Sequence, residues 1–451
     1  LEAGAVLNQT TGTETASTIV GQKGAGRLVV RDGARLLTNT LALGPLVGAA
    51  SGDLLLSDAG SRIEAQFLSA GERADATVLV NEGAVLQVQS LNLARFETAT
   101  ASLVVDGAGS QLVLGGGISS IGSQGGRGTL ELTGGARLQG DGALLGIGSG
   151  KVGDFSVLRA SGQGTQLADV GVRVSTGGLL HLRDGVAWQD GVNGLEVNGG
   201  TAQLEGMQAR LKLLSVEGQF GANDALISSG RVDVSRGSVL LLGRGEMEVG
   251  LGGTLTISGA GSQVLGFDNL LLLGDLAVNG GALLSGGVIG LDDRGRIHGD
   301  GGTIRATVIT QKGKVSPGNS PGTLTIDGDM TLGSEAELEL ELAANRHDVL
   351  QVTGALRLDG GHIVLSFLGG FAPHAGQQFD LLQVGGSFSS TAGVQVRGLL
   401  PGWQFDTGFD AGTGRFTLTA LTDGVSAVPE PASWCLWLVA GALAGWRLRR
   451  R

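Results

Sequence analysis

One short stretch of this 451-residue chain gathers carboxylate, guanidinium and imidazole groups. Two carboxylic acids near a histidine could protonate a leaving oxygen and activate a water molecule, which is the chemistry of polysaccharide cleavage. These residues share one glycine-rich corner instead of being spread over successive strands, so we favour a structural role. We predict no catalytic, cofactor or metal site. The stretch comprises Asp292, Asp293, Arg294, Arg296, His298 and Asp300.

A second acidic group follows, in which four glutamates alternate with apolar residues. Side chains alternate between the two faces of a strand, so the four carboxylates would share one face. A solvated face that discourages edge pairing is the simpler interpretation. Capture of calcium by the carboxylates is the alternative, and it stays open. The glutamates are Glu335, Glu337, Glu339 and Glu341.

Other motif-like features carry little chemistry. The residues Gly148–Gly153 fit a G-x-G-x-x-G pattern, but Asp154–Leu158 predict a strand where a phosphate site needs the start of a helix. Cys435 is the single cysteine, so no internal disulfide can form. A packing role for Cys435 is a simpler interpretation than acylation. No H-E-x-x-H motif occurs. Histidines without metal-ligand spacing are His181, His347, His362 and His374.

The composition narrows the class of protein. Hydrophobic residues make up 41% of the chain, enough for a large core, and 84 glycines stand against 7 prolines. Aromatic residues are 4% and tyrosine is absent, which argues against an aromatic-lined sugar cleft as the main function. The net charge of -11 would repel phosphate backbones, so we expect no nucleic-acid partner.

Glycine corners recur along residues 20 to 290. Gly33, Gly83 and Gly135 are 50 and 52 residues apart, and a second variant at Gly60, Gly109 and Gly164 is spaced by 49 and 55. The two series interleave, so the unit is about 25 residues, a length typical of solenoids. Further corners are Gly177-Gly178, Gly199-Gly200, Gly261 and Gly280-Gly281.

Each unit offers an alternating strand, a turn where positive φ is favourable, and a second short strand. We therefore predict an all-β chain that forms a right-handed parallel β-helix. Even strand spacing would also suit antiparallel sandwiches, but these do not explain the 50-residue double period.

The rhythm changes after residue 290. The run Ser316–Ile326 contains paired Pro-Gly turns, and the segment His347–Gly354 follows it. Together they resemble the closing repeats of autotransporter-type β-helical passengers, where such segments form late structural rungs. We expect no autotransporter barrel of alternating strands with aromatic girdles. Residues 1–330 are predicted to be the β-helix, and 331–426 the closing rungs and a β cap. The aromatic residues expected in the β cap are Phe367, Phe371, Phe379, Phe388, Trp403, Phe405, Phe409 and Phe416.

The last residues, 427–451, divide into three parts. An extended link, Val428, Pro429, Glu430 and Pro431, precedes an apolar run that begins at Trp434 and contains Trp437, Gly441, Gly445 and Trp446. A basic end follows, with Arg447, Arg449, Arg450 and Arg451. As a helix, about 15 residues would span about 22 Å, somewhat short of the ~30 Å hydrocarbon core. We predict a short transmembrane helix with its arginines in the cytoplasm.

This tail closely resembles the PEP-CTERM sorting signal of Gram-negative bacteria, and Pro429-Glu430-Pro431 matches its namesake motif. The resemblance implies processing by an exosortase, a transient stay in the inner membrane, and delivery to the cell surface or extracellular matrix. We therefore predict a structural or adhesive surface protein, with an exopolysaccharide matrix as a further partner. A carbohydrate-active enzyme on the same scaffold is the alternative. The chain starts at Leu1 without a basic or long apolar leader, and we expect the gene to encode a signal peptide upstream.

Overall fold

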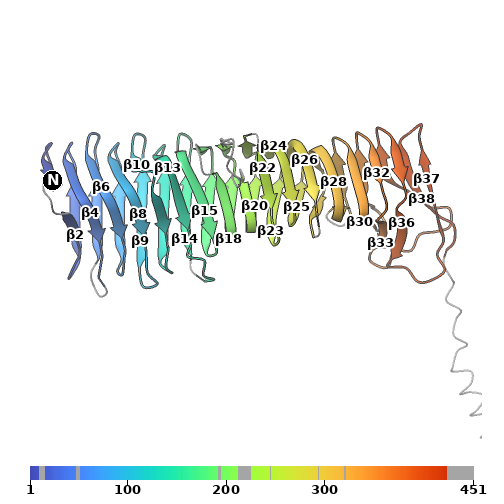
Figure 1. The fold of residues 1–451 in the computed structure, drawn as a ribbon, viewed down its shortest axis with the longest axis horizontal. Helices are drawn as coiled ribbons and strands as arrows, with labels where there is room; N and C mark the ends of the chain where they lie inside the picture. The colour runs from blue at the N-terminus through green and yellow to red at the C-terminus, as the bar shows by residue number, and fades with distance from the viewer. Residues whose placement is uncertain are drawn as a thin grey trace, which may run out of the picture.

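The computed structural model describes residues 1–9, 16–46, 51–153, 155–190, 194–211, 225–243, 245–292, 294–318 and 321–423. In these residues the chain forms a rod of stacked rungs (Figure 1). Strands pair in parallel with the strands of the preceding and following rungs, and the described part contains no helix. The predicted all-β solenoid is confirmed, and parallel pairing rules out the antiparallel sandwich. The right-handed winding stays a prediction.

Sheet 1 is the stack of strands that precede the corner glycines. Each strand pairs with the next member of the stack in parallel, and the longest strands also bend into the neighbouring sheets. Its members are β3 (Gly26–Val30), β5 (Gly52–Leu56), β7 (Ala76–Val80), β9 (Thr100–Asp106), β12 (Arg127–Thr133), β14 (Ser156–Ser161), β16 (Gly178–Arg183), β18 (Leu195–Glu205), β20 (Ala225–Ser235), β23 (Gly253–Ser258), β25 (Asp275–Asn279), β27 (Arg296–Gly299), β28 (Gly302–Pro317), β30 (Met330–Leu342), β33 (His362–Phe367) and β36 (Gly393–Arg397).

Sheets 2 and 3 are the first and second halves of the segment that follows each corner glycine. In some rungs one bent strand supplies both halves, and in others two short strands do so; β1 and β2, for example, both pair with β4. Their members are β1 (Val6–Asn8), β2 (Ser17–Val20), β4 (Arg35–Leu43), β6 (Arg62–Ala70), β8 (Val85–Leu93), β10 (Gln111–Leu114), β11 (Ile118–Ile121), β13 (Arg137–Ile147), β15 (Gln166–Ser175), β17 (Ala187–Asp190), β19 (Gln208–Leu211), β21 (Val239–Leu242), β22 (Glu246–Val249), β24 (Gln263–Leu272), β26 (Leu283–Leu291), β29 (Thr323–Ile326), β31 (Val349–Val352), β32 (Leu356–Leu358), β34 (Gln378–Val384) and β35 (Phe388–Ser390).

The corner between sheets 1 and 2 alternates between two turns. At Asp32 and Gly33 both central residues have positive φ, 56° and 75°, which is the φ pattern of a type I′ turn. At Gly60 only the second central residue does, with φ of 88°, as in a type II turn. The first kind recurs at Gly83 and Gly135, the second at Gly109 and Gly164. This alternation is the physical origin of the interleaved double period in the sequence.

Buried hydroxyls connect the two kinds of corner. In these six corners the residue after the glycine is alanine in the first kind and serine or threonine in the second, and Ser61, Ser110 and Thr165 are fully buried. Each hydroxyl oxygen accepts a hydrogen bond from the glycine N–H of the rung before, so no buried donor is left unpaired. The pairs are Gly33 to Ser61 at 3.0 Å, Gly83 to Ser110 at 3.0 Å, and Gly135 to Thr165 at 3.1 Å.

A different corner leads from sheet 3 back into sheet 1. Gly177-Gly178 and Gly199-Gly200 occupy this corner, so grouping them with the Gly33 series was wrong. The chain passes so closely here that a Cβ on Gly178 would lie 2.3 Å from the carbonyl oxygen of Ile147. Glycine at this corner is required by close backbone approach, because Gly178 itself does not have positive φ.

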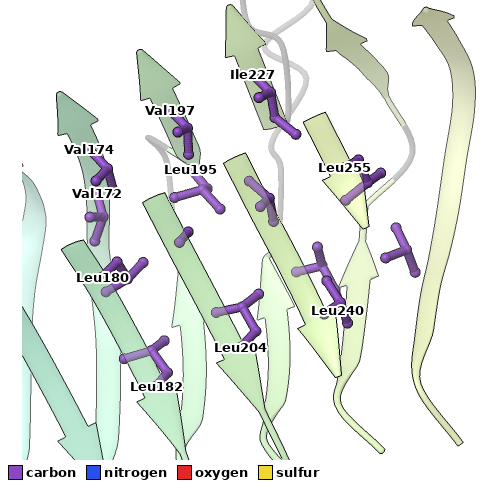
Figure 2. Packing of buried hydrophobic residues seen from close by; sticks show 14 of the residues in the cluster. Val172, Val174, Leu180, Leu182, Leu195, Val197, Leu204, Ile227, Leu240 and Leu255 are labelled. Carbon is purple, nitrogen blue, oxygen red and sulfur yellow. The ribbon is translucent and has the colours of Figure 1, made fainter. Parts of the chain in front are cut away.

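The core fills the interior of the rod. Alternate residues of each strand point inward and stack on the equivalent residues of neighbouring rungs, as Val174, Val197 and Ile227 do in Figure 2. Aliphatic residues make up nearly all of this core. Trp188 is a large exception, and its buried indole Nε1 donates to the carbonyl oxygen of Val170 at 3.1 Å.

The C-terminal end of the rod is closed by a change of pairing. Strands β37 (Phe405–Asp410) and β38 (Arg415–Ala420) form an antiparallel hairpin, and β38 also pairs antiparallel with β34. Phenylalanines pack beneath this hairpin: the ring centroids of Phe388 and Phe409 are 4.5 Å apart, and those of Phe367 and Phe405 are 5.5 Å apart. Parallel pairing continues up to β36.

Candidate functional site

The histidine of the predicted acidic cluster makes its contact across rungs. His298 on β27 places Nε2 3.1 Å from Oδ2 of Asp275 on β25, one rung before. The hydrogen bond with His298 holds the pKa of Asp275 below its ordinary value, although burial opposes this, and the charges of His298 and Arg296 add to the effect. The structure therefore pairs His298 with an acid outside the predicted cluster.

Asp300 uses its carboxylate to hold a turn. Its Oδ1 accepts a hydrogen bond from the N–H of Thr323 at 3.0 Å, and its own N–H donates to Oδ1 of Asn279 at 3.0 Å. Arg346 lies 3.7 Å from its other carboxylate oxygen. These contacts fasten the residues after the second Pro-Gly turn to the preceding rung.

The structure therefore directs two of the six predicted residues to partners outside the cluster. His298 faces Asp275, Asp300 faces the turn, and the Asp292 N–H donates to the Leu272 carbonyl oxygen at 3.3 Å. Asp293 lies outside the described residues.

Three of the four glutamates on β30 form ion pairs with lysines or an arginine from other rungs. Lys312 Nζ is 3.3 Å from Glu335, Lys314 Nζ is 3.4 Å from Glu337 and also pairs with Glu339, and Arg397 is 3.6 Å from Glu337. Burial alone would raise the pKa of Glu339, but the hydrogen bond and charge of Lys314 hold it below its ordinary value. Among the described residues, no group of three or more His, Cys, Asp or Glu side chains is arranged to hold a metal ion.

A buried carboxylate that the sequence did not single out lies beside this face. Asp348 is fully buried, and its two oxygens accept hydrogen bonds from the N–H groups of Gly322 and Glu341, each at 2.7 Å. Arg346 donates to the carbonyl oxygen of Pro321 at 2.6 Å. Asp300, Arg346 and Asp348 thus form a clasp around residues 321–323. The sequence feature that could have identified Asp348 is its position directly before a strand of alternating apolar residues.

The glycine motif at Gly148–Gly153 is a turn. Gly148, Gly150 and Gly153 have positive φ, and the strand β14 follows from Ser156. Lys151 within the motif forms an ion pair with Glu97. The described residues offer no helix start at this position, so the motif lacks the N–H cluster that a phosphate site uses.

The sorting tail lies outside the described residues, which end at Asp423. This covers Val428 to Pro431, the apolar run from Trp434 to Trp446, Cys435 and the final arginines. Within the described residues no helix is long and apolar enough to cross a membrane. The predicted transmembrane helix therefore stays a prediction.

Comparison with known proteins supports the tail directly. Residues 427–451 match the PEP-CTERM protein-sorting motif. No curated protein matches the chain. The motif implies processing by an exosortase and export through the membrane to the cell surface.

Proposed function

We propose that this chain is a structural protein of the Gram-negative cell surface or extracellular matrix, without enzymatic activity, whose β-solenoid acts as a right-handed, rigid rod. The observation that carries the proposal is the sorting motif at residues 427–451, which follows in sequence a solenoid that ends in an antiparallel cap. The apolar run from Trp434 would hold the chain in the inner membrane as a short helix until an exosortase processes it.

Two features support a structural role over a catalytic one. His298 and Asp300 spend their polar atoms on contacts between rungs, and the glutamates of β30 face lysines and an arginine. A catalytic acid needs a carboxyl group that can reach substrate and change its protonation state. The contacts of Asp300 instead hold the backbone of Thr323. An adhesive role would use the outer faces of the same rod.

The sorting proposal is tested in the native host by changing Pro429, Glu430 and Pro431 together to alanine. We expect the variant to accumulate uncut in the inner-membrane fraction, because the exosortase no longer recognises it. Deletion of residues 429–451 should instead leave the body in the periplasm or the medium. Immunoblots of membrane, surface and medium fractions measure both, and Ser433→Ala is the matched control. An unchanged distribution of both variants would show that the tail does not direct sorting.

The absence of enzymatic activity is tested with the purified full chain and a panel of neutral and acidic polysaccharides. We expect no release of reducing ends and no unsaturated products from wild type or from the Asp292→Ala/Asp293→Ala variant. Surface behaviour of the variant should equal that of wild type. Cleavage by wild type that is lost in the double variant would establish the carbohydrate-active alternative.

A further inference from the structure

The outward side of sheet 2 carries a shallow groove in the middle of the rod. It crosses β13, β15, β17 and β19 and has a volume of about 220 Å³. Alanine side chains form its floor, and long polar side chains rise around them. The outward-facing lining consists of Arg137, Gln166, Ala168, Ala187, Gln189 and Gln208.

The strand register spaces the amides two rungs apart. Along one column, Gln166 pairs in register with Ala187, and Ala187 with Gln208. In the adjacent column, Gln189 pairs in register with Ala168. Parallel strands lie about 4.8 Å apart, so the backbones of Gln166 and Gln208 are separated by about 10 Å, and an alanine lies between them.

These amides are exposed and unused. Gln166, Gln189 and Gln208 are all exposed, and in the part of the chain that the structure describes their side chains make no hydrogen bond. Polar side chains on adjacent rungs behave differently: near the C-terminus, Thr325 Oγ1 donates to Oε1 of Gln351 at 3.3 Å. The alternation of glutamine with alanine therefore does not build a ladder of hydrogen bonds between side chains of successive rungs. It leaves donors and acceptors pointing outward at a regular interval.

This spacing fits a ligand that is itself polar and periodic. An amide offers two donors and an acceptor, and a sugar hydroxyl donates and accepts, so each glutamine can bind a pair of neighbouring hydroxyls. The alanine floor leaves room for a chain that lies along the rod axis. The groove has no aromatic side chain facing outward and no apolar anchor of the kind that dominates protein interfaces.

Charge selects among polysaccharides. Arg137 is the one cation among the six outward-facing lining residues, and no carboxylate is among them. The whole chain carries a net charge of -11, which opposes the approach of a polyanion. We propose that this groove binds a neutral polysaccharide, held by the amides of Gln166, Gln189 and Gln208 along the rod axis. This proposal adds a ligand to the proposed function. It depends on that function because the protein must reach the extracellular matrix to contact the polymer.

The test is affinity electrophoresis of the purified full chain in native gels that contain dextran or polygalacturonate. We expect dextran to retard wild type more than polygalacturonate does. The Gln166→Ala/Gln208→Ala variant should bind dextran about tenfold more weakly, because each lost hydrogen bond contributes about 0.5–1.5 kcal/mol. The matched control is Gln203→Ala/Gln395→Ala, which removes two amides from sheet 1. Circular dichroism verifies that all variants are folded.

Three results would overturn the proposal: no retardation of wild type by dextran, an equal loss in the test and control variants, or stronger retardation by polygalacturonate. Binding of a pure polymer does not depend on export. A negative result therefore leaves the sorting proposal intact, and mislocalisation of the tail variant leaves the groove intact.

Discussion

Replacing Gly178 with alanine is expected to destabilise the solenoid strongly, although the change adds a single methyl group. The new Cβ would lie 2.3 Å from the carbonyl oxygen of Ile147 and 2.9 Å from that of Ser175. Both atoms belong to the backbone, that of Ile147 in the preceding rung and that of Ser175 in the same rung, so neither can turn aside as a side chain would. Overpacking of this kind costs about 1–3 kcal/mol. Chemical denaturation followed by circular dichroism measures the loss as a lower midpoint.

Gly290→Ala is the matched control. Gly290 also lies in a strand and does not have positive φ, but a Cβ there would meet no atom within 4 Å. We expect this variant to equal wild type or to gain about 0.4–1 kcal/mol, since alanine restricts the unfolded chain. Equal midpoints for Gly178→Ala and Gly290→Ala would mean that the corner adjusts freely and that close approach does not fix its glycine.

The solenoid was predictable because turn geometry is local. A residue such as Gly33 needs positive φ, only glycine adopts it at low cost, and the repeat of that need gives the spacing of the rungs. The division of glycines between two corners was not predictable. Gly178 and Gly33 are both corner glycines in the sequence, yet close backbone approach fixes Gly178 and the positive φ fixes Gly33. The distinction depends on which segments meet in space.

The candidate site shows the same limit. The spacing of Asp292 to Asp300 indicates that the acids are close in sequence, but the contacts follow the rung spacing, which joins His298 to Asp275 and Asp300 to Thr323. The lysines that face the glutamates of β30 lie 23 or more residues earlier. The sorting tail was predictable because a motif, an apolar run and a basic end are read in linear order.

Replacing Asp348 with alanine should weaken the C-terminal rungs more than any surface substitution. The change leaves the buried N–H groups of Gly322 and Glu341 without acceptors. Each unpaired buried donor costs about 1–3 kcal/mol, so the expected loss is about 2–6 kcal/mol. Limited proteolysis should cut first near residues 321–348, because the clasp no longer fastens the turn. Arg305→Ala, which removes an exposed ion pair with Asp327, is the control and should cost less than about 1 kcal/mol.

The same carboxylate gives the fold a pH dependence of defined sign. Burial raises the pKa of Asp348 from 3.8 to about 7, against the hydrogen bonds from Glu341 and Gly322, and the charges of Glu341 and Glu339 raise it further. Between these values the folded chain retains a proton that the unfolded chain has lost. The contribution of Asp348 to stability is therefore complete below about pH 4 and is lost as the pH rises through about 7. One group gives a slope of at most about 1.4 kcal/mol per pH unit.

Other groups must be separated from this effect. The pKa values of Asp275, Asp327 and Glu339 are lowered by their partners, so their stabilisation is lost only in acid, below the window in question. Histidines also change charge between pH 5 and 8. The difference between wild type and Asp348→Asn isolates the carboxyl group, because asparagine does not ionise and leaves every histidine in place. Denaturation midpoints should fall from pH 5 to pH 8 more steeply in wild type than in Asp348→Asn. Parallel profiles would show that Asp348 is ionised in the folded chain throughout, with its two N–H donors outweighing burial.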